Sequence, residues 1–107
     1  MDIIFRTGDF PQQVAIAQWV MDAYPEFSPV YGRLGKIYES RQMYQEALRT
    51  YQSWAGQFPD EGEAYFSIAR VYEKTGQIPQ FKQALQKALR LDPSLGKESP
   101  TTQRFKQ

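Results

Sequence analysis

An internal repeat constrains the fold of this chain more than any other feature. Proline recurs at equal intervals, at Pro25, Pro59 and Pro93. This period of about 34 residues is typical of stacked repeat arrays rather than of one globular core. The 107 residues hold about three such periods. A shift by one period also aligns like with like in the pairs Tyr31/Tyr65, Lys36/Arg70, Tyr38/Tyr72 and Glu39/Glu73.

Each repeat unit is predicted to form two helices. Apolar residues between 27 and 40 recur at the spacing of one helical face, and a similar pattern follows from 44 to 57. In the next unit the same spacing predicts helices over 60–74 and 78–91. A further helix is predicted upstream, over 11–24. Ser28 and the segment 60–63 are expected to cap helix starts, and Gly76 is expected to end a helix in the left-handed conformation. Since no segment alternates as a strand does, the fold class is predicted to be all-α.

The first full unit contains the spaced residues Tyr31, Leu34, Gly35, Tyr38, Tyr44, Ala47, Tyr51 and Pro59, and the second full unit repeats much of this pattern. In this pattern the two complete units resemble the tetratricopeptide repeat. This resemblance implies a right-handed solenoid of antiparallel helix pairs, with about two and a half repeats over residues 1–93. A partial repeat would span 1–25, full repeats would span 26–59 and 60–93, and a polar C-terminal tail would follow at 94–107. Trp54 departs from the pattern, because a large ring replaces the usual small residue.

The resemblance also implies a concave groove, lined by the first helices of successive units, that holds an extended peptide or a helix of a partner protein. Lys36 and Arg70 are expected to form a basic row beside an acidic row, with Phe66 as an apolar anchor and Ser67 near the rim. The alternative is that these polar residues only keep an exposed face soluble. The expected groove residues are Gly32, Arg33, Lys36, Glu39, Phe66, Arg70, Glu73 and Lys74, with Asp2 and Phe5 continuing the rows.

The composition excludes most catalytic chemistry. Cys and His are absent, which excludes thiol and imidazole catalysis, disulfides and zinc fingers. Acids at 60–63 are explained by a helix start, and Glu39 and Glu73 by a solvated ridge. No loop concentrates oxygen ligands or glycines, so no metal site, no cofactor and no enzyme activity are predicted. Asn is absent too, which argues against the binding mode in which such grooves hold a C-terminal carboxylate.

The charge balance and the hydropathy narrow the expected partners to proteins. The formal net charge is only +1, so the chain lacks the excess of basic residues that is typical of proteins that bind nucleic acid. No run of residues resembles a signal peptide or a membrane span. We therefore expect a soluble interaction module, with a cytoplasmic location slightly favoured. The short start before residue 8 suggests a piece of a longer repeat protein. Two alternatives are a homo-oligomer that self-associates through uncapped terminal helices and a regulatory repeat region of a larger enzyme.

Overall fold

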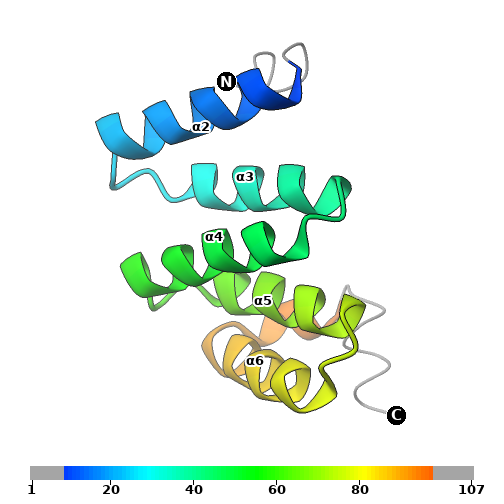
Figure 1. The fold of residues 1–107 in the computed structure, drawn as a ribbon. Helices are drawn as coiled ribbons and strands as arrows, with labels where there is room; N and C mark the ends of the chain where they lie inside the picture. Colours follow the sequence, from blue (N-terminus) through cyan, green and yellow to red (C-terminus); the bar gives the residue numbers. More distant parts are fainter. Residues whose placement is uncertain (1–8, 98–107) are drawn as a thin grey trace.

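The computed structural model describes residues 9–97 as five α-helices and a short 3-10 helix, stacked in chain order (Figure 1). Each helix packs mainly on those before and after it, and the stack measures 40 × 26 × 21 Å. This arrangement confirms the predicted all-α solenoid of helix pairs. The helices are α2 (Phe10–Ala23), α3 (Pro29–Ser40), α4 (Tyr44–Gln57), α5 (Gly62–Lys74), α6 (Ile78–Leu91) and the 3-10 helix η1 (Pro93–Lys97).

The helix boundaries lie close to the predicted ones, whereas two of the predicted caps are wrong. Helices α4 and α6 begin and end where the periodicity placed them, and α3 begins at Pro29, directly after the expected cap residue Ser28. Asp9 caps α2, because its Oδ1 accepts a hydrogen bond of 3.0 Å from the amide of Gln12. Ser28 makes no side-chain cap, since its backbone (φ −67°, ψ −30°) is already helical and a capping residue needs an extended one. The segment 60–63 makes none either, and Glu61 turns its carboxylate to Trp54 instead.

The turns that follow α3 and α5 share one backbone conformation. Gly76 has a φ of 78°, which confirms its predicted left-handed stop, and Gln42, one repeat earlier, has a φ of 62°. In both turns the next residue donates an amide hydrogen bond of 2.9 Å to the carbonyl five residues before it. This is the pattern of a Schellman cap, which requires a left-handed residue. The turn therefore has the same conformation in both repeats, although the first has Gln42 in place of the glycine that adopts this conformation without strain.

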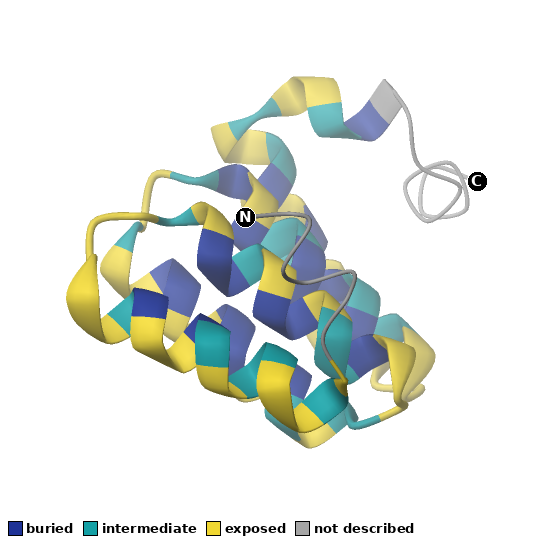
Figure 2. Cartoon of the chain, turned by 90° about the horizontal axis from the view of Figure 1, so that it is seen from above, coloured by how far each residue is buried: buried dark blue, intermediate teal, exposed yellow. Residues whose placement is uncertain are grey.

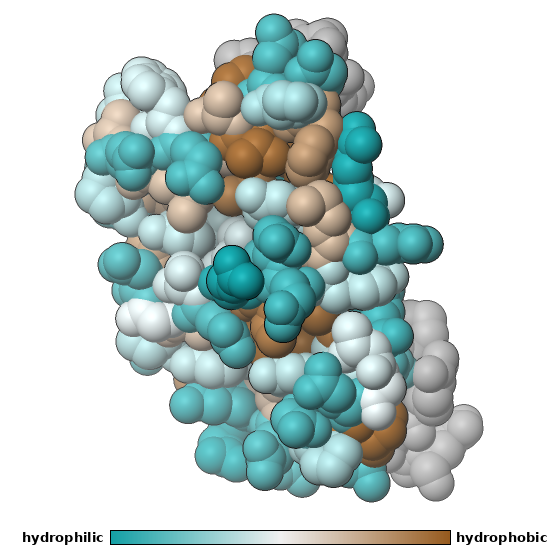
Figure 3. All heavy atoms as spheres, in the orientation of Figure 1, coloured by the Kyte–Doolittle hydropathy of each residue, from teal (hydrophilic) through white to brown (hydrophobic). Residues whose placement is uncertain are grey.

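The core follows the inner faces of the helices from α2 to α6 (Figure 2). Tyr51 of α4 is fully buried, and its ring lies against Gly35 of α3 so closely that a Cβ there would be 2.1 Å from the ring. Trp54 is also buried, and a Cβ on Gly32 would be 3.2 Å from its ring. The large ring at position 54 is thus accommodated beside a glycine. Outside the core the surface is mostly hydrophilic, with separate hydrophobic patches on the face that Figure 3 shows.

Two predictions concern the ends of the chain: the first residues of the groove rows and the polar C-terminal tail. The predicted groove residues Asp2 and Phe5, and residues 98–107 of the predicted tail, lie outside the described residues. The beginning of that tail forms η1, which packs on α6 and buries Gly96. Leu95 of η1 lies beside α5, the first helix of the second full unit.

Candidate functional site

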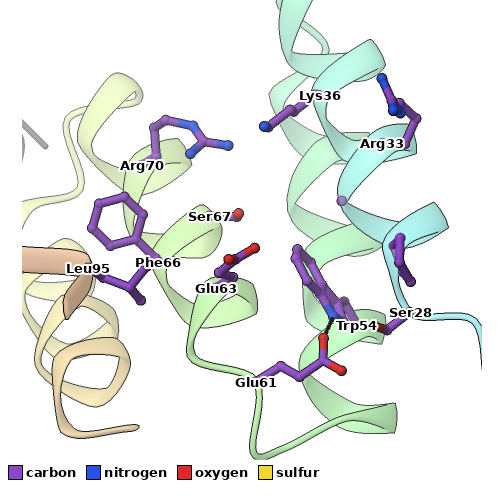
Figure 4. A pocket seen from close by; sticks show the side chains of 12 residues that line it. Ser28, Arg33, Lys36, Trp54, Glu61, Glu63, Phe66, Ser67, Arg70 and Leu95 are labelled. Carbon is purple, nitrogen blue, oxygen red and sulfur yellow. Dashed lines mark hydrogen bonds between the residues drawn. The ribbon is translucent and has the colours of Figure 1, made fainter. Parts of the chain in front are cut away.

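A cavity of about 520 Å³ opens between α3 and α5, the first helices of the two complete units (Figure 4). Helix α4 contributes Trp54 to this cavity, and η1 contributes Leu95. The cavity therefore spans the boundary between the repeats and not the interior of either one. Its lining residues are Ser28, Pro29, Gly32, Arg33, Lys36, Trp54, Glu61, Glu63, Phe66, Ser67, Arg70 and Leu95.

The structure brings some of the predicted groove residues together and separates others. Of the predicted set, Gly32, Arg33, Lys36, Phe66 and Arg70 line the cavity. Phe66 is half-buried rather than freely exposed, because its side chain packs against the core cluster of α5 and α6. Glu39, Glu73 and Lys74 do not line the cavity.

Glu39 is the centre of a buried network and not part of a solvated ridge. The residue is 7% exposed, and its carboxylate receives hydrogen bonds from three other helical residues. Arg70 donates from Nη2 to Oε1 at 2.7 Å and from Nε to Oε2 at 3.1 Å, so the pair is bidentate. Lys74 Nζ lies 3.1 Å from Oε2, and the Tyr51 hydroxyl donates to Oε1 at 2.5 Å. The predicted acidic row is therefore wrong at Glu39, because the carboxylate is used to join α3, α4 and α5.

The network shifts the pKa values of its members in opposite directions. Burial alone raises the pKa of Glu39, but the hydrogen bonds from Arg70 and Tyr51 and the nearby cations outweigh it and lower that pKa to about 2. Burial raises the pKa of Tyr51, and the negative charge of Glu39 raises it further. Burial lowers the pKa of Arg70, yet its bonds to Glu39 produce a net increase. All three groups therefore keep one protonation state across the neutral range, unlike a general acid or base that must exchange a proton there.

Lys36 and Arg70 occupy equivalent positions in the repeat but have different environments. Arg70 is held by Glu39, whereas Lys36 is exposed and has no ion-pair partner among residues 9–97. The residue one repeat before Glu39 is Phe5, which has no carboxylate to offer. In Figure 4 the two cationic side chains point toward one another across the cavity.

Sequence reasoning did not assign several of the lining residues to the groove. Trp54 was noted only as a large ring in place of a small residue. Its Nε1 donates a hydrogen bond of 2.7 Å to Glu61, and the carboxylates of Glu61 and Glu63 both line the cavity. Both acids had been explained as a helix start. Leu95 had been placed in the tail. The one signal in the sequence that could have assigned Trp54 to the groove was its size. A large ring at a position that is usually small implies that the ring fills space between two units.

The repeat, the helix pairs and the groove can be compared with known proteins. The family model described as tetratricopeptide repeat matches residues 40–95, which is more than half of the chain. The chain belongs to the tetratricopeptide repeat family. The match covers α4, α5, α6 and the first three residues of η1. A comparison with curated proteins found no significant match.

Several solved structures of MamA share this tetratricopeptide fold. MamA MSR-1 aligns with a TM-score of 0.71 at 27% identity, over 79% of this chain and 49% of that one. A second crystal structure of MamA has a TM-score of 0.75 at 22% identity, over 87% of this chain and 54% of that one. MamA from Desulfovibrio magneticus RS-1 has a TM-score of 0.67 at 24% identity, over 84% and 51%. This chain thus spans about half the length of these MamA structures.

Between residues 9 and 97, every helix is too short or too polar to cross a membrane. The same residues contain no group of three or more carboxylates placed to hold a metal ion.

Proposed function

We propose that this tetratricopeptide chain is a protein-interaction module whose groove between α3 and α5 binds an extended segment of another protein. The observation that carries the proposal is the cavity at the repeat boundary, where exposed charges and a partly exposed ring line the same space. Lys36 is exposed and unpaired in the described part of the chain, and the half-buried Phe66 lines the same cavity. Such a combination favours recognition, since unpaired charges select a partner and apolar surface adds affinity.

The proposal favours a binding role over a catalytic one. The titratable network beside the cavity is fixed in its protonation states by its own hydrogen bonds. On the cavity, Glu61 accepts a hydrogen bond from the indole of Trp54, a contact that joins the two repeats. The relatives and the family are consistent with a scaffold of this kind.

Cross-linking from inside the groove tests the proposal. A photoreactive amino acid at Arg33, on the cavity, is compared with the same group at Lys82, which lies on the exposed side of α6. We expect the first to cross-link a protein from native lysate that the second does not, and Lys36→Glu to reduce that product while Lys82→Glu leaves it unchanged. Circular dichroism checks that both variants keep their helices. The proposal is wrong if the cross-linked product is the same in both positions, or survives both Lys36→Glu and Phe66→Ala.

Arg70 is a poor choice for such a test, although its position in the groove suggests it. Arg70→Glu would place a second carboxylate against the buried Glu39. Like charges in a poorly solvated site are strongly destabilising, so lost binding would report lost folding. Lys36 avoids this problem because it makes no ion pair within the described range.

Self-association is a second candidate, favoured by exposed apolar residues on the two outermost α-helices of the described stack. Trp19 and Tyr24 are 63% and 51% exposed and touch edge to face at the end of α2. Ile78 and Leu91 are exposed on α6. Exposed patches of this kind commonly mark interfaces. Light scattering over a hundredfold range of concentration separates the cases, since a constant monomer mass contradicts self-association, and Trp19→Ser should restore the monomer if a larger species forms.

A further inference from the structure

The groove carries opposite charge at its two ends, and we infer that its partner segment is an extended peptide with an acidic, an apolar and a basic residue in alternate positions. This inference rests on the proposed function, because it names the chemistry of the segment that the groove would hold. It concerns charges that are unpaired within residues 9–97 and that α3 and α5 hold along one cavity (Figure 4).

The end of the groove near the carboxyl termini of α3 and α5 is positive. The single carboxylate of Glu39 is shared by Arg70 and Lys74, so this network keeps a net charge of +1. Lys36 adds a second positive charge and has no ion-pair partner in the part of the chain that the structure describes. The side chain of Arg70 is 26% exposed toward the cavity that it lines, and can donate to a ligand as well as to Glu39. A carboxylate is the ligand group that this end would attract.

The end near the start of α5 is negative. Glu63 is exposed in the first turn of α5 and lines the cavity without an ion pair to any residue between 9 and 97. The neighbouring carboxylate of Glu61 is held in place by the indole of Trp54 at 2.7 Å. Because the hydrogen bond to Trp54 uses only part of its capacity, Glu61 can still accept from a cation. A Lys or Arg side chain is therefore the ligand group for this end.

Apolar surface separates the two charged ends. Phe66 lies on α5 between Glu63 and Arg70 in sequence and lines the cavity with Leu95 and Trp54. An apolar side chain of the partner would cover this surface, which is otherwise in contact with water. The order across the groove is thus cationic, apolar and anionic, and a complementary segment is acidic, apolar and basic.

The spacing along α5 fixes the spacing in the peptide. Glu63 and Arg70 are seven residues apart, which is about 10 Å along a helix at about 1.5 Å per residue. An extended peptide rises about 3.3 Å per residue and points alternate side chains to one side. Residues i, i+2 and i+4 therefore face the groove together and span about 13 Å, a length that long charged side chains adjust to about 10 Å. A nucleic-acid strand fits this surface poorly, because its phosphates would meet Glu61 and Glu63.

Defined peptides test the inference directly. Three nine-residue peptides, acetylated and amidated, carry Leu at the centre and Gly and Ser elsewhere. They differ only in the two residues that flank the Leu at a distance of two: Glu and Lys, Glu and Glu, or Lys and Lys. Each is titrated into the isotope-labelled full chain, and NMR shift changes give the affinity and the residues affected. We expect the Glu/Lys peptide to bind about three to ten times more tightly than the others, with shifts on α3 and α5.

Charge reversal in the groove should change the preferred peptide. Lys36→Glu cancels the positive charge of its end and leaves the groove as a whole negative, so the Lys/Lys peptide should become the tightest. Glu63→Lys cancels the negative charge of the other end and should favour the Glu/Glu peptide. The matched controls are Lys82→Glu on α6 and Glu46→Lys, since Glu46 also lies in the first turn of its helix and does not line the cavity. Both controls should keep the original order of affinities. Because the preference is electrostatic, it should shrink as salt is raised from about 20 mM toward about 1 M.

The outcomes separate this inference from the proposed function. The inference is overturned if no peptide binds, if all three bind equally, or if the order of affinities is the same in Lys36→Glu and Glu63→Lys as in the native chain. If the groove cross-links a partner while the peptides fail, the groove binds by other chemistry and only the inference falls. If the cross-linking also fails, the proposed function falls with it.

Discussion

Replacing Glu39 by Gln should remove the ionic connection between the two complete repeats. The carboxylate is 7% exposed and holds Arg70 and Lys74 of α5 together with the Tyr51 hydroxyl of α4. Its pKa falls from 4.5 to about 2, and at about 1.4 kcal/mol per pH unit this corresponds to roughly 3 kcal/mol of stabilisation at pH 7. Removal of one partner from a buried ion pair costs a similar amount, about 3–5 kcal/mol. Since Arg70 and Lys74 both reach water in part, we expect the lower end of that range.

The pH dependence of this effect has a definite sign. Because the folded pKa of Glu39 lies below the unfolded value, its contribution is complete above about pH 4.5 and disappears as the pH falls toward 2. Urea unfolding followed by circular dichroism at pH 7, 4 and 2.5 should therefore show a difference between native chain and Glu39→Gln that shrinks with acidification. Glu46→Gln is the matched control, since Glu46 has no side-chain ion pair within the described residues. A loss at pH 7 below about 0.5 kcal/mol, which is typical of an exposed ion pair, or a difference independent of pH, would refute the reasoning.

Three further substitutions test other features of the fold by urea unfolding. Gln42→Gly should raise the free energy of unfolding by about 0.5–1 kcal/mol, because Gln42 has a φ of 62° that glycine adopts without strain. Gly76→Ala should lower it by about 1 kcal/mol, because Gly76 has a φ of 78°. Equal effects in the same direction would contradict this reasoning. Gly35→Ala should cost about 2–3 kcal/mol, since its Cβ would lie 2.1 Å from the ring of Tyr51, and an unchanged midpoint would show that the ring can move. Trp54→Phe should cost about 1–2 kcal/mol through loss of a 2.7 Å hydrogen bond to a carboxylate, and no loss would mean that water replaces it.

The helices were predictable because their signals are local or repeated. Apolar spacing placed α4 and α6 at their observed bounds, and the glycine near the end of the second full unit's first helix identified the left-handed stop at Gly76. The same stop at Gln42 was missed, because the sequence there lacks the glycine that reveals such a turn. The caps at Ser28 and 60–63 failed because a residue type shows only that a cap can form, and not where its side chain points.

The candidate site was predictable only in outline. Equivalence in the repeat placed Lys36 and Arg70 on the groove, and both line the cavity. The same equivalence suggested one shared role, which is wrong, because a side chain's role depends on the neighbouring repeat as well as on its own. Arg70 meets Glu39 of the preceding unit, whereas the corresponding residue for Lys36 is Phe5 in the sequence.

The sequence by itself determined the period, the helix pairs and the family, because these depend on spacing along one helix and between similar units. Only the tertiary structure decided which charges between residues 9 and 97 are buried in ion pairs and which are exposed. It buried Glu39, left Lys36 exposed, and brought Trp54 of one unit to Glu61 of the next. Burial and pairing arise where different helices meet, so they depend on distances in space that no spacing along the chain encodes.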